Sequence, residues 1–277
     1  MSLPAAFQPG LSAIGLILAA MTVVALIETV IPLHARGRWN RGHLAANLAL
    51  TLITFATNAL LNAGLLTAVW WLDARGFGLL HVLALPPLVA SVIAVVLLDF
   101  SFYVAHVAMH RVPAFWRFHC VHHSDPAVDV TTTIRQHPGE GLIRYAFMAA
   151  AVFALGPSLG AFAIYRAASA LNGLLEHANI RMPLGLDRWL SLVTTWPYLH
   201  KIHHSRDALE TDSNYGNLFS CFDRLFLTFT PSERGVDVDY GLEGLDDPAT
   251  QTTAGLLALP FRLAPASDPA GMAQQPS

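Results

Sequence analysis

The most informative stretch of this chain is His119-Cys120-Val121-His122-His123. Its pattern is repeated at His200-Lys201-Ile202-His203-His204. Each stretch places histidines at relative positions one, four and five. Residues three and four apart share one face of a helix, so we expect the three imidazoles of a triplet to converge on one point. Neutral imidazole is a good ligand for iron, zinc, copper and nickel. Two identical triplets therefore predict a metal site rather than core histidines.

Further histidines extend this set. His106 and His110 form an i, i+4 pair upstream, and His177 lies between the triplets. Nine histidines are too many for one ion, because a structural zinc is closed by four ligands. Two ions with four or five imidazoles each fit the count, and a catalytic pair also needs open positions for oxygen. We predict no catalytic residue beyond the metal ligands, which are His106, His110, His119, His122, His123, His177, His200, His203 and His204.

The composition is that of a membrane protein. The chain has 277 residues, of which 54% are hydrophobic and 13% charged, and its mean hydropathy is +0.46. Soluble domains carry about 25% charged residues. The net charge of −3 gives no reason to expect a nucleic-acid partner. The two cysteines, Cys120 and Cys221, form no disulfide framework and are expected to be free thiols.

Apolar stretches predict the membrane helices. Residues 11–33, 44–71 and 88–110 are each long enough to cross a bilayer, which needs about 20 residues. Residues 141–177 are too long for one span and are expected to form a hairpin that turns at Gly156-Pro157. The predicted fold is all-α, a polytopic membrane bundle of about four to five helices with a cytosolic histidine-rich di-metal cap.

Three segments are expected along the chain. Residues 1–87 hold the first membrane spans, 88–230 form the catalytic domain, and 231–277 form a cytosolic tail that is partly disordered. Within the tail, the short apolar piece 255–263 is expected to lie on the membrane surface.

Basic residues indicate which side of the membrane carries the histidines. Arg36, Arg38 and Arg41 follow the first span, and the first triplet lies on the same face with further arginines. The positive-inside rule makes this face cytoplasmic, and the hairpin returns the second triplet to it. The abundance of arginine and alanine suggests a bacterial chain, so we predict a bacterial inner-membrane protein. The further arginines are Arg111, Arg117, Arg135 and Arg144.

Several short motifs follow one another between Leu88 and Thr230. In order they are Asp99-x3-Tyr103-x2-His106-x3-His110, His119-x2-His122-His123, His177-Ala178-Asn179, His200-x2-His203-His204 and Asn214-Tyr215-Gly216. This ordered set resembles the fatty acid hydroxylase and sterol desaturase superfamily. The closing Asp-Arg-Leu-Phe-Gly-Thr motif of that family is present at 223–228, except that Leu227 stands in place of the glycine.

The resemblance implies a membrane di-iron centre that activates O2 to hydroxylate or desaturate a fatty acyl or sterol-like lipid. The choice of iron comes from the family, because zinc would accept the same imidazoles. It also implies a separate electron donor, such as a ferredoxin, a cytochrome or a reductase. Asp99 is two helical turns from His106 and is expected to accept its second N–H. Candidates for a supporting group or a tenth ligand are His137, Asp99, Glu176, Asn179 and Asn214.

Other functions fit the same residues. The substrate could be a carotenoid or another isoprenoid, since the motifs do not separate these lipids. The chain could also be a membrane metal-binding protein without catalytic activity. A metal conduit is disfavoured, because the spans hold few ionisable groups while the histidines gather on one face. Product analysis separates these alternatives and decides between a hydroxyl group and a double bond.

Overall fold

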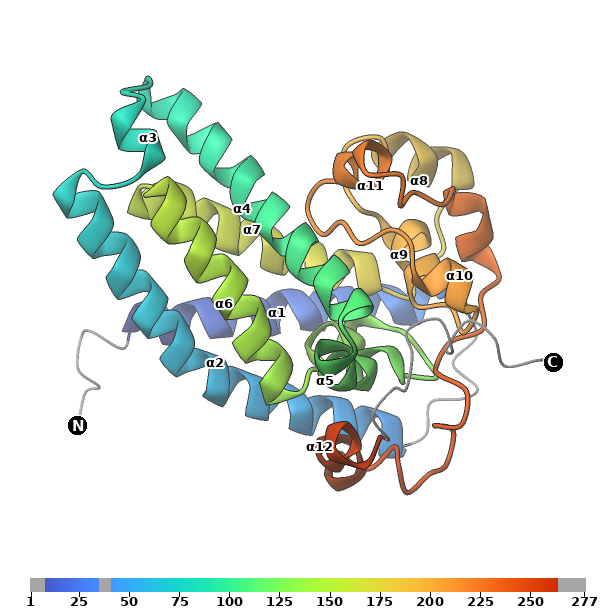
Figure 1. Ribbon diagram of the computed structural model, residues 1–277. Helices are drawn as coiled ribbons and strands as arrows, with labels where there is room; N and C mark the ends of the chain where they lie inside the picture. Colours follow the sequence, from blue (N-terminus) through green and yellow to red (C-terminus); the bar gives the residue numbers. More distant parts are fainter. Residues whose placement is uncertain (1–7, 35–40, 264–277) are drawn as a thin grey trace.

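Long helices form one bundle, and short helices form a cap at one end of it (Figure 1). The structure is a computed structural model that describes residues 8–34 and 41–263. Within these residues the only strand-like pairings are three isolated bridges, such as the one between Thr194 and Phe219. The expectation of an all-α fold is therefore confirmed.

The bundle contains the two helices that are long and apolar enough, among the described residues, to cross a membrane. These stretches are His43–Val82 and Pro87–Arg111. The first includes α2 and the short helix α3, and the second is α4. The helices of the bundle are α1 (Gln8–Val30), α2 (Arg41–Arg75), α3 (Leu79–Val82), α4 (Pro87–Arg111), α6 (Pro138–Leu155) and α7 (Leu159–His177).

The predicted hairpin turn at Gly156-Pro157 joins α6 to α7. Gly156 caps α6 in the left-handed region, with φ 60° and ψ 58°. A Cβ at this position would lie 1.8 Å from the carbonyl oxygen of Phe77, so only glycine fits the close approach. Ser158 then caps α7 by accepting a hydrogen bond from the backbone N–H of Ala161.

The bundle core lies between α2, α4, α6 and α7. Leu72, Leu98 and Phe162 are fully buried in it. Other apolar side chains of the same helices point outward, among them Leu60 at 81% exposure and Leu88 at 76%. Helices that are apolar both inside and outside are typical of proteins whose surroundings are lipid.

A buried polar network fixes the first triplet to α2. The Arg135 guanidinium is fully buried. It donates to the Val121 carbonyl at 3.0 Å, to Asn47 Oδ1 at 2.9 Å and to Ser124 Oγ at 2.9 Å. Burial alone would raise the pKa of the neighbouring Asp125 carboxyl, but Arg135, His43 and Thr132 together outweigh it and hold that pKa well below its usual range. The network joins α2, α5 and the 3-10 helix η3 (Val130–Ile134).

Replacing Arg135 with Leu should lower the free energy of unfolding by about 3–5 kcal/mol, because it removes a buried cation near the Asp125 carboxylate and leaves the buried oxygens that Arg135 contacts without their donor. Arg188→Leu is the matched control. Arg188 is exposed and pairs with Glu233 at 3.2 Å, so its loss should cost less than about 1 kcal/mol. Denaturant unfolding of both variants in detergent measures the difference. Equal destabilisation by the two substitutions would contradict this role of Arg135.

The cap is made of short helices and the loops that join them. Its helix α12 packs against α2 and α5 and buries Leu256 and Leu259 in the apolar piece predicted at 255–263. Arg36, Arg38 and the tail 264–277 lie outside the described residues, and the domain boundaries at 87 and 230 stay a prediction. The helices of the cap are α5 (Pro113–His123), α8 (Leu184–Leu190), α9 (Pro197–His203), α10 (Ala208–Thr211), α11 (Cys221–Leu225), the 3-10 helix η4 (Ser232–Val236) and α12 (Thr253–Arg262).

Candidate metal centre

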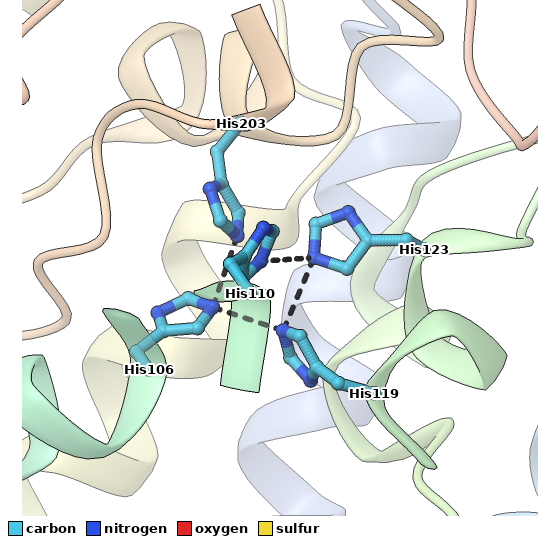
Figure 2. A group of neighbouring side chains, drawn as sticks. All are labelled: His106, His110, His119, His123 and His203. Atoms are coloured by element: carbon cyan, nitrogen blue, oxygen red, sulfur yellow. Dashed lines mark hydrogen bonds between the residues drawn. The ribbon is translucent and has the colours of Figure 1, made fainter. Parts of the chain in front are cut away.

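Nine histidines from α4, α5, α7, α9 and the residue after α9 meet at the end of the bundle that carries the cap. They form two groups, and within each group the ligand nitrogens all lie within 4.8 Å of one another. Figure 2 shows the rings of the first group pointing toward a common centre. The structure thus brings together the whole predicted ligand set. The first group is His106, His110, His119, His123 and His203, and the second is His122, His177, His200 and His204.

Each triplet is divided between the two groups, so the expectation that a triplet converges on one point is wrong. On α5, His119 and His123 belong to the first group and His122 to the second. In the second triplet, His203 belongs to the first group, while His200 and His204 belong to the second. The reason is helical geometry. At 3.6 residues per turn, a residue at i+4 lies about 40° to one side of residue i, and one at i+3 about 60° to the other.

Backbone carbonyls orient the imidazoles of the first group. His106 Nδ1 lies 2.8 Å from the Tyr215 carbonyl, and His203 Nδ1 lies 2.8 Å from the Ser213 carbonyl. A carbonyl can only accept, so both Nδ1 atoms carry the proton and both Nε2 atoms carry a lone pair. These two Nε2 atoms are 3.0 Å apart. Two facing lone pairs repel unless a cation lies between them, so the residues fit a metal ion.

The second group is oriented in the same way. His177 Nδ1 lies 2.8 Å from the Gly173 carbonyl, which leaves the lone pair on its Nε2 atom. That atom is 3.0 Å from His200 Nε2 and 3.1 Å from His122 Nε2. The donor set of this group is therefore also arranged for a shared cation.

Two carboxylates that the sequence reasoning missed support the first group. Glu140 Oε1 lies 3.3 Å from His119 Nδ1, and Arg144 Nη1 approaches the same oxygen at 3.4 Å. Asp212 Oδ1 lies 3.2 Å from His110 Nδ1. Carboxylates behind ligand histidines fix the ring orientation and strengthen the donor. The only sequence signal was for Glu140, at the end of the His-Pro-Gly-Glu motif that begins at His137.

Asp99 does not accept from His106, so that expectation is wrong. Its carboxylate accepts the backbone N–H groups of Leu218 and Phe219, at 3.3 and 2.9 Å. Seven residues along a helix are about 10.5 Å, which is too far for direct contact. Asp99 instead holds the loop whose Tyr215 carbonyl orients His106.

Three other candidate residues belong to neither histidine group, and their side chains form hydrogen bonds that stabilise loops. His137 accepts from the Gly139 N–H at 2.9 Å at the start of α6, and its Nε2 lies 3.2 Å from the Leu257 carbonyl. Asn179 exchanges two hydrogen bonds with the backbone of His34. Asn214 has a positive φ of 52° and donates to the carbonyls on either side of its loop.

Glu176 is the candidate that lies beside the second group. Its Oε1 is 3.9 Å from His200 Nε2 and 3.8 Å from His177 Nδ1. Asn172 Nδ2 donates to the other carboxylate oxygen at 3.4 Å. Glu176 thus lies beside the inward-facing Nε2 atom of His200, whereas Glu140 lies behind His119 at its Nδ1 atom.

The cap histidines are held in the neutral form that binds metals. Burial lowers the pKa of His203 to about 4. Burial and the nearby His203 lower the pKa of His122 to about 3. The same cause lowers the pKa of His119, His123, His200 and His204 well below the ordinary value. At neutral pH, protons therefore do not compete for these nitrogens.

The comparison with known families agrees with this geometry. The family model for fatty acid hydroxylases matches residues 91–228. This range contains all nine histidines of the two groups. The chain belongs to the fatty acid hydroxylase family. The resemblance stated from the motifs is confirmed, and the family together with the two apolar helices indicates a membrane protein.

Curated relatives are lipid-modifying enzymes by name. The chain is 35% identical over 153 residues to the ornithine lipid hydroxylase OlsE of Rhizobium tropici, a match that covers 55% of this chain and 45% of the relative. It is 32% identical over 146 residues to the alkylglycerol monooxygenase of Caenorhabditis elegans, covering 52% of this chain and 28% of that protein. The alkylglycerol monooxygenase of Xenopus tropicalis is 31% identical over 144 residues, covering 52% and 31%. The matches thus span less than half the length of each relative. No solved structure matches this chain.

Proposed function

We propose that this chain is a membrane oxygenase that holds two iron ions between its nine histidines and hydroxylates a lipid. The observation that supports the proposal is the pair of histidine groups, which contain five and four histidines. Within each group, Nε2 lone pairs point toward the centre. When bound, two iron ions would supply the activation of O2. Iron rather than zinc is proposed from the family to which the chain belongs.

The side chains and carbonyls of the chain would hold and orient such a centre. The Tyr215, Ser213 and Gly173 carbonyls fix the Nδ1 protons, which keeps each Nε2 free to bind. Glu140 and Asp212 would strengthen two of these donors. Nearly all of the histidines are buried, so bulk water is kept from the site. Because the nine donors are neutral, the ions would keep their full charge and act as strong Lewis acids.

The substrate is proposed to be a membrane lipid with a long acyl or alkyl chain. The named relatives are an ornithine lipid hydroxylase and alkylglycerol monooxygenases. Both names describe insertion of oxygen into a lipid, which favours a hydroxyl product over a double bond. The histidines lie at the end of apolar helices, where a lipid could present one C–H bond. Electrons would come from a separate donor such as a ferredoxin, a cytochrome or a reductase.

Mass spectrometry of lipids from cells that produce the chain or its His203→Ala variant tests this proposal. A hydroxylated lipid that depends on His203 supports it. A modified carotenoid or sterol-like lipid would instead show a different substrate class. Unchanged lipids in every pool would favour a metal-binding protein without catalytic activity.

We also propose a multi-pass topology, with α1, α2, α4 and the α6–α7 pair in a bacterial inner membrane and the histidines on its cytoplasmic side. Cys120 is buried, so new thiols are better reporters of sidedness. Leu209 on α10 and Val82 on α3 are highly exposed, at 85% and 79%. In a Cys221→Ser background, an impermeant thiol reagent should label Val82→Cys in intact cells and Leu209→Cys only in opened membranes. Labelling of Leu209→Cys in intact cells would reverse the orientation.

A further inference from the structure

The cap carries an apolar surface that the described part of the chain leaves uncovered. It is formed by the end of α8 and the segment after it, together with α11 and the segment that follows. These parts are joined, because the backbone N–H of Ser220 donates to the Val193 carbonyl at 3.1 Å, and Thr194 forms a bridge with Phe219. In Figure 1, α8 and α11 lie side by side next to α4. The exposed residues of this surface, here called the apolar cap face, are Leu186, Trp189, Leu192, Val193, Leu225 and Leu227.

Leu227 is the most informative residue of this face. Its φ of 60° lies in the left-handed region, which costs conformational energy for any side chain that has a Cβ. The closing motif of the family has glycine here, for which this backbone conformation costs little. The Leu227 side chain is 92% exposed, so contacts within the described chain hardly offset the strain. A strained and fully exposed leucine is explained if the side chain packs against something outside the chain.

The neighbours of Leu227 show how deep this face lies along the bundle. The Phe226 ring lies 5.5 Å from Tyr103 and 5.7 Å from Phe100, between ring centroids. Phe100 comes 11 residues before Arg111, the last residue of α4, which is about 16 Å along a helix. The apolar cap face therefore lies beside the middle of α4 rather than beyond its end. If α4 crosses the bilayer, this face is at the depth of the hydrocarbon.

The backbone hydrogen bonds of the apolar cap face and its lack of charge are compatible with a position in the hydrocarbon. An irregular segment is tolerated in a bilayer only where its polar backbone groups are paired. Here the Phe226 N–H donates to the Phe222 carbonyl at 2.9 Å, and the Thr228 N–H to the Asp223 carbonyl at 2.8 Å. Residues 189–193 and 225–230 carry no charged side chain. The Nη1 and Nη2 atoms of the nearby Arg224 donate to the Ser220 and Ser191 carbonyls, so both terminal nitrogens have acceptors.

We propose that the apolar cap face is inserted into the hydrocarbon of the cytoplasmic leaflet beside α4. The cap would then be partly embedded in the membrane, and not wholly cytosolic as the sequence indicated. The apolar side chains that α4 turns outward, such as Val92 and Val104, would continue the same lipid-facing surface. This inference rests on the proposed topology, since it requires α4 to cross the bilayer with the histidines on the cytoplasmic side, but it does not require any oxygenase activity.

Spin labels attached to single cysteines test the insertion. Leu227→Cys and Leu192→Cys, each in a Cys221→Ser background, are labelled and placed in vesicles of phosphatidylcholine and phosphatidylglycerol. Dissolved oxygen concentrates in hydrocarbon, whereas a water-soluble nickel chelate does not enter it. We expect the ratio of oxygen to nickel relaxation to be at least several-fold higher at both positions than at Leu209→Cys. Leu209 is the matched control, because it is an exposed leucine of the cap on α10, outside the apolar cap face.

Val92→Cys, on the outward side of α4, reports whether that helix lies in the bilayer. A lipid signal at Val92 with an aqueous signal at both Leu227 and Leu192 would overturn the insertion and leave the proposed function untouched. Labels at Leu227 and Leu192 that neither oxygen nor nickel reaches would show that protein covers the face, for example a second copy of the chain. That result would overturn the proposal as well.

Discussion

Protein purified in the presence of iron is expected to contain about two metal ions per chain, one for each histidine group. In the double variant His122→Ala, His203→Ala, both ions should be lost under the same conditions. His122 belongs to the second group and His203 to the first, so each group loses one donor. Loss of a group that merely supports a ligand typically costs 10–100-fold in metal affinity. Loss of the ligand itself should cost at least as much.

Elemental analysis of the purified proteins measures this effect directly, without any substrate. Each single variant should keep about one ion, because the other group is intact. His81→Ala is the matched control, since His81 lies on α3, belongs to neither group, and approaches Asp73 at 3.8 Å. A full metal complement in the double variant would refute the assignment of these histidines as ligands.

Incubation of the purified protein with a membrane lipid, isotopically labelled O2, and a ferredoxin with its reductase should give a labelled hydroxyl group on the lipid. The balance is one C–H bond, O2, two electrons and two protons, which give one C–OH group and one water. One labelled oxygen atom is therefore expected per product molecule. The His203→Ala variant should lose the activity, by more than the 10–100-fold that loss of a supporting group typically causes.

His81→Ala is again the control and should keep the activity of the unaltered chain, because His81 belongs to neither histidine group and α3 lies at the end of the bundle away from the cap (Figure 1). A new double bond without label would identify a desaturase in place of a hydroxylase. The enzymatic proposal fails if fatty acyl, sterol-like and carotenoid pools are identical with the active protein, with His203→Ala and without O2. A metal-binding protein without catalytic activity would then explain the two histidine groups.

Much of this site could be predicted from the sequence, because metal ligands are a matter of residue type and local spacing. All nine histidines that the structure brings together were named from their spacing and from the family motifs. The turn between α6 and α7 could also be predicted, since Gly156 and Pro157 interrupt an apolar stretch that is too long for one helix. Local backbone chemistry determines such features, and they do not depend on the rest of the fold.

The tertiary structure alone decided which histidines lie in the same group and what holds them. Helical spacing separates His122 from His123 on α5, but it could not show which of the two is joined by His203, because that depends on how α5 and α9 face each other across the site. The carboxylate of Asp212 and the carbonyl of Tyr215 reach their histidines from more than 100 residues away. The outward position of Leu227 beside α4 likewise depends on long-range packing, through the contact of Phe226 with Tyr103. A sequence pattern determines which side chains a helix offers on each face. The packing of the helices against one another determines what those faces meet.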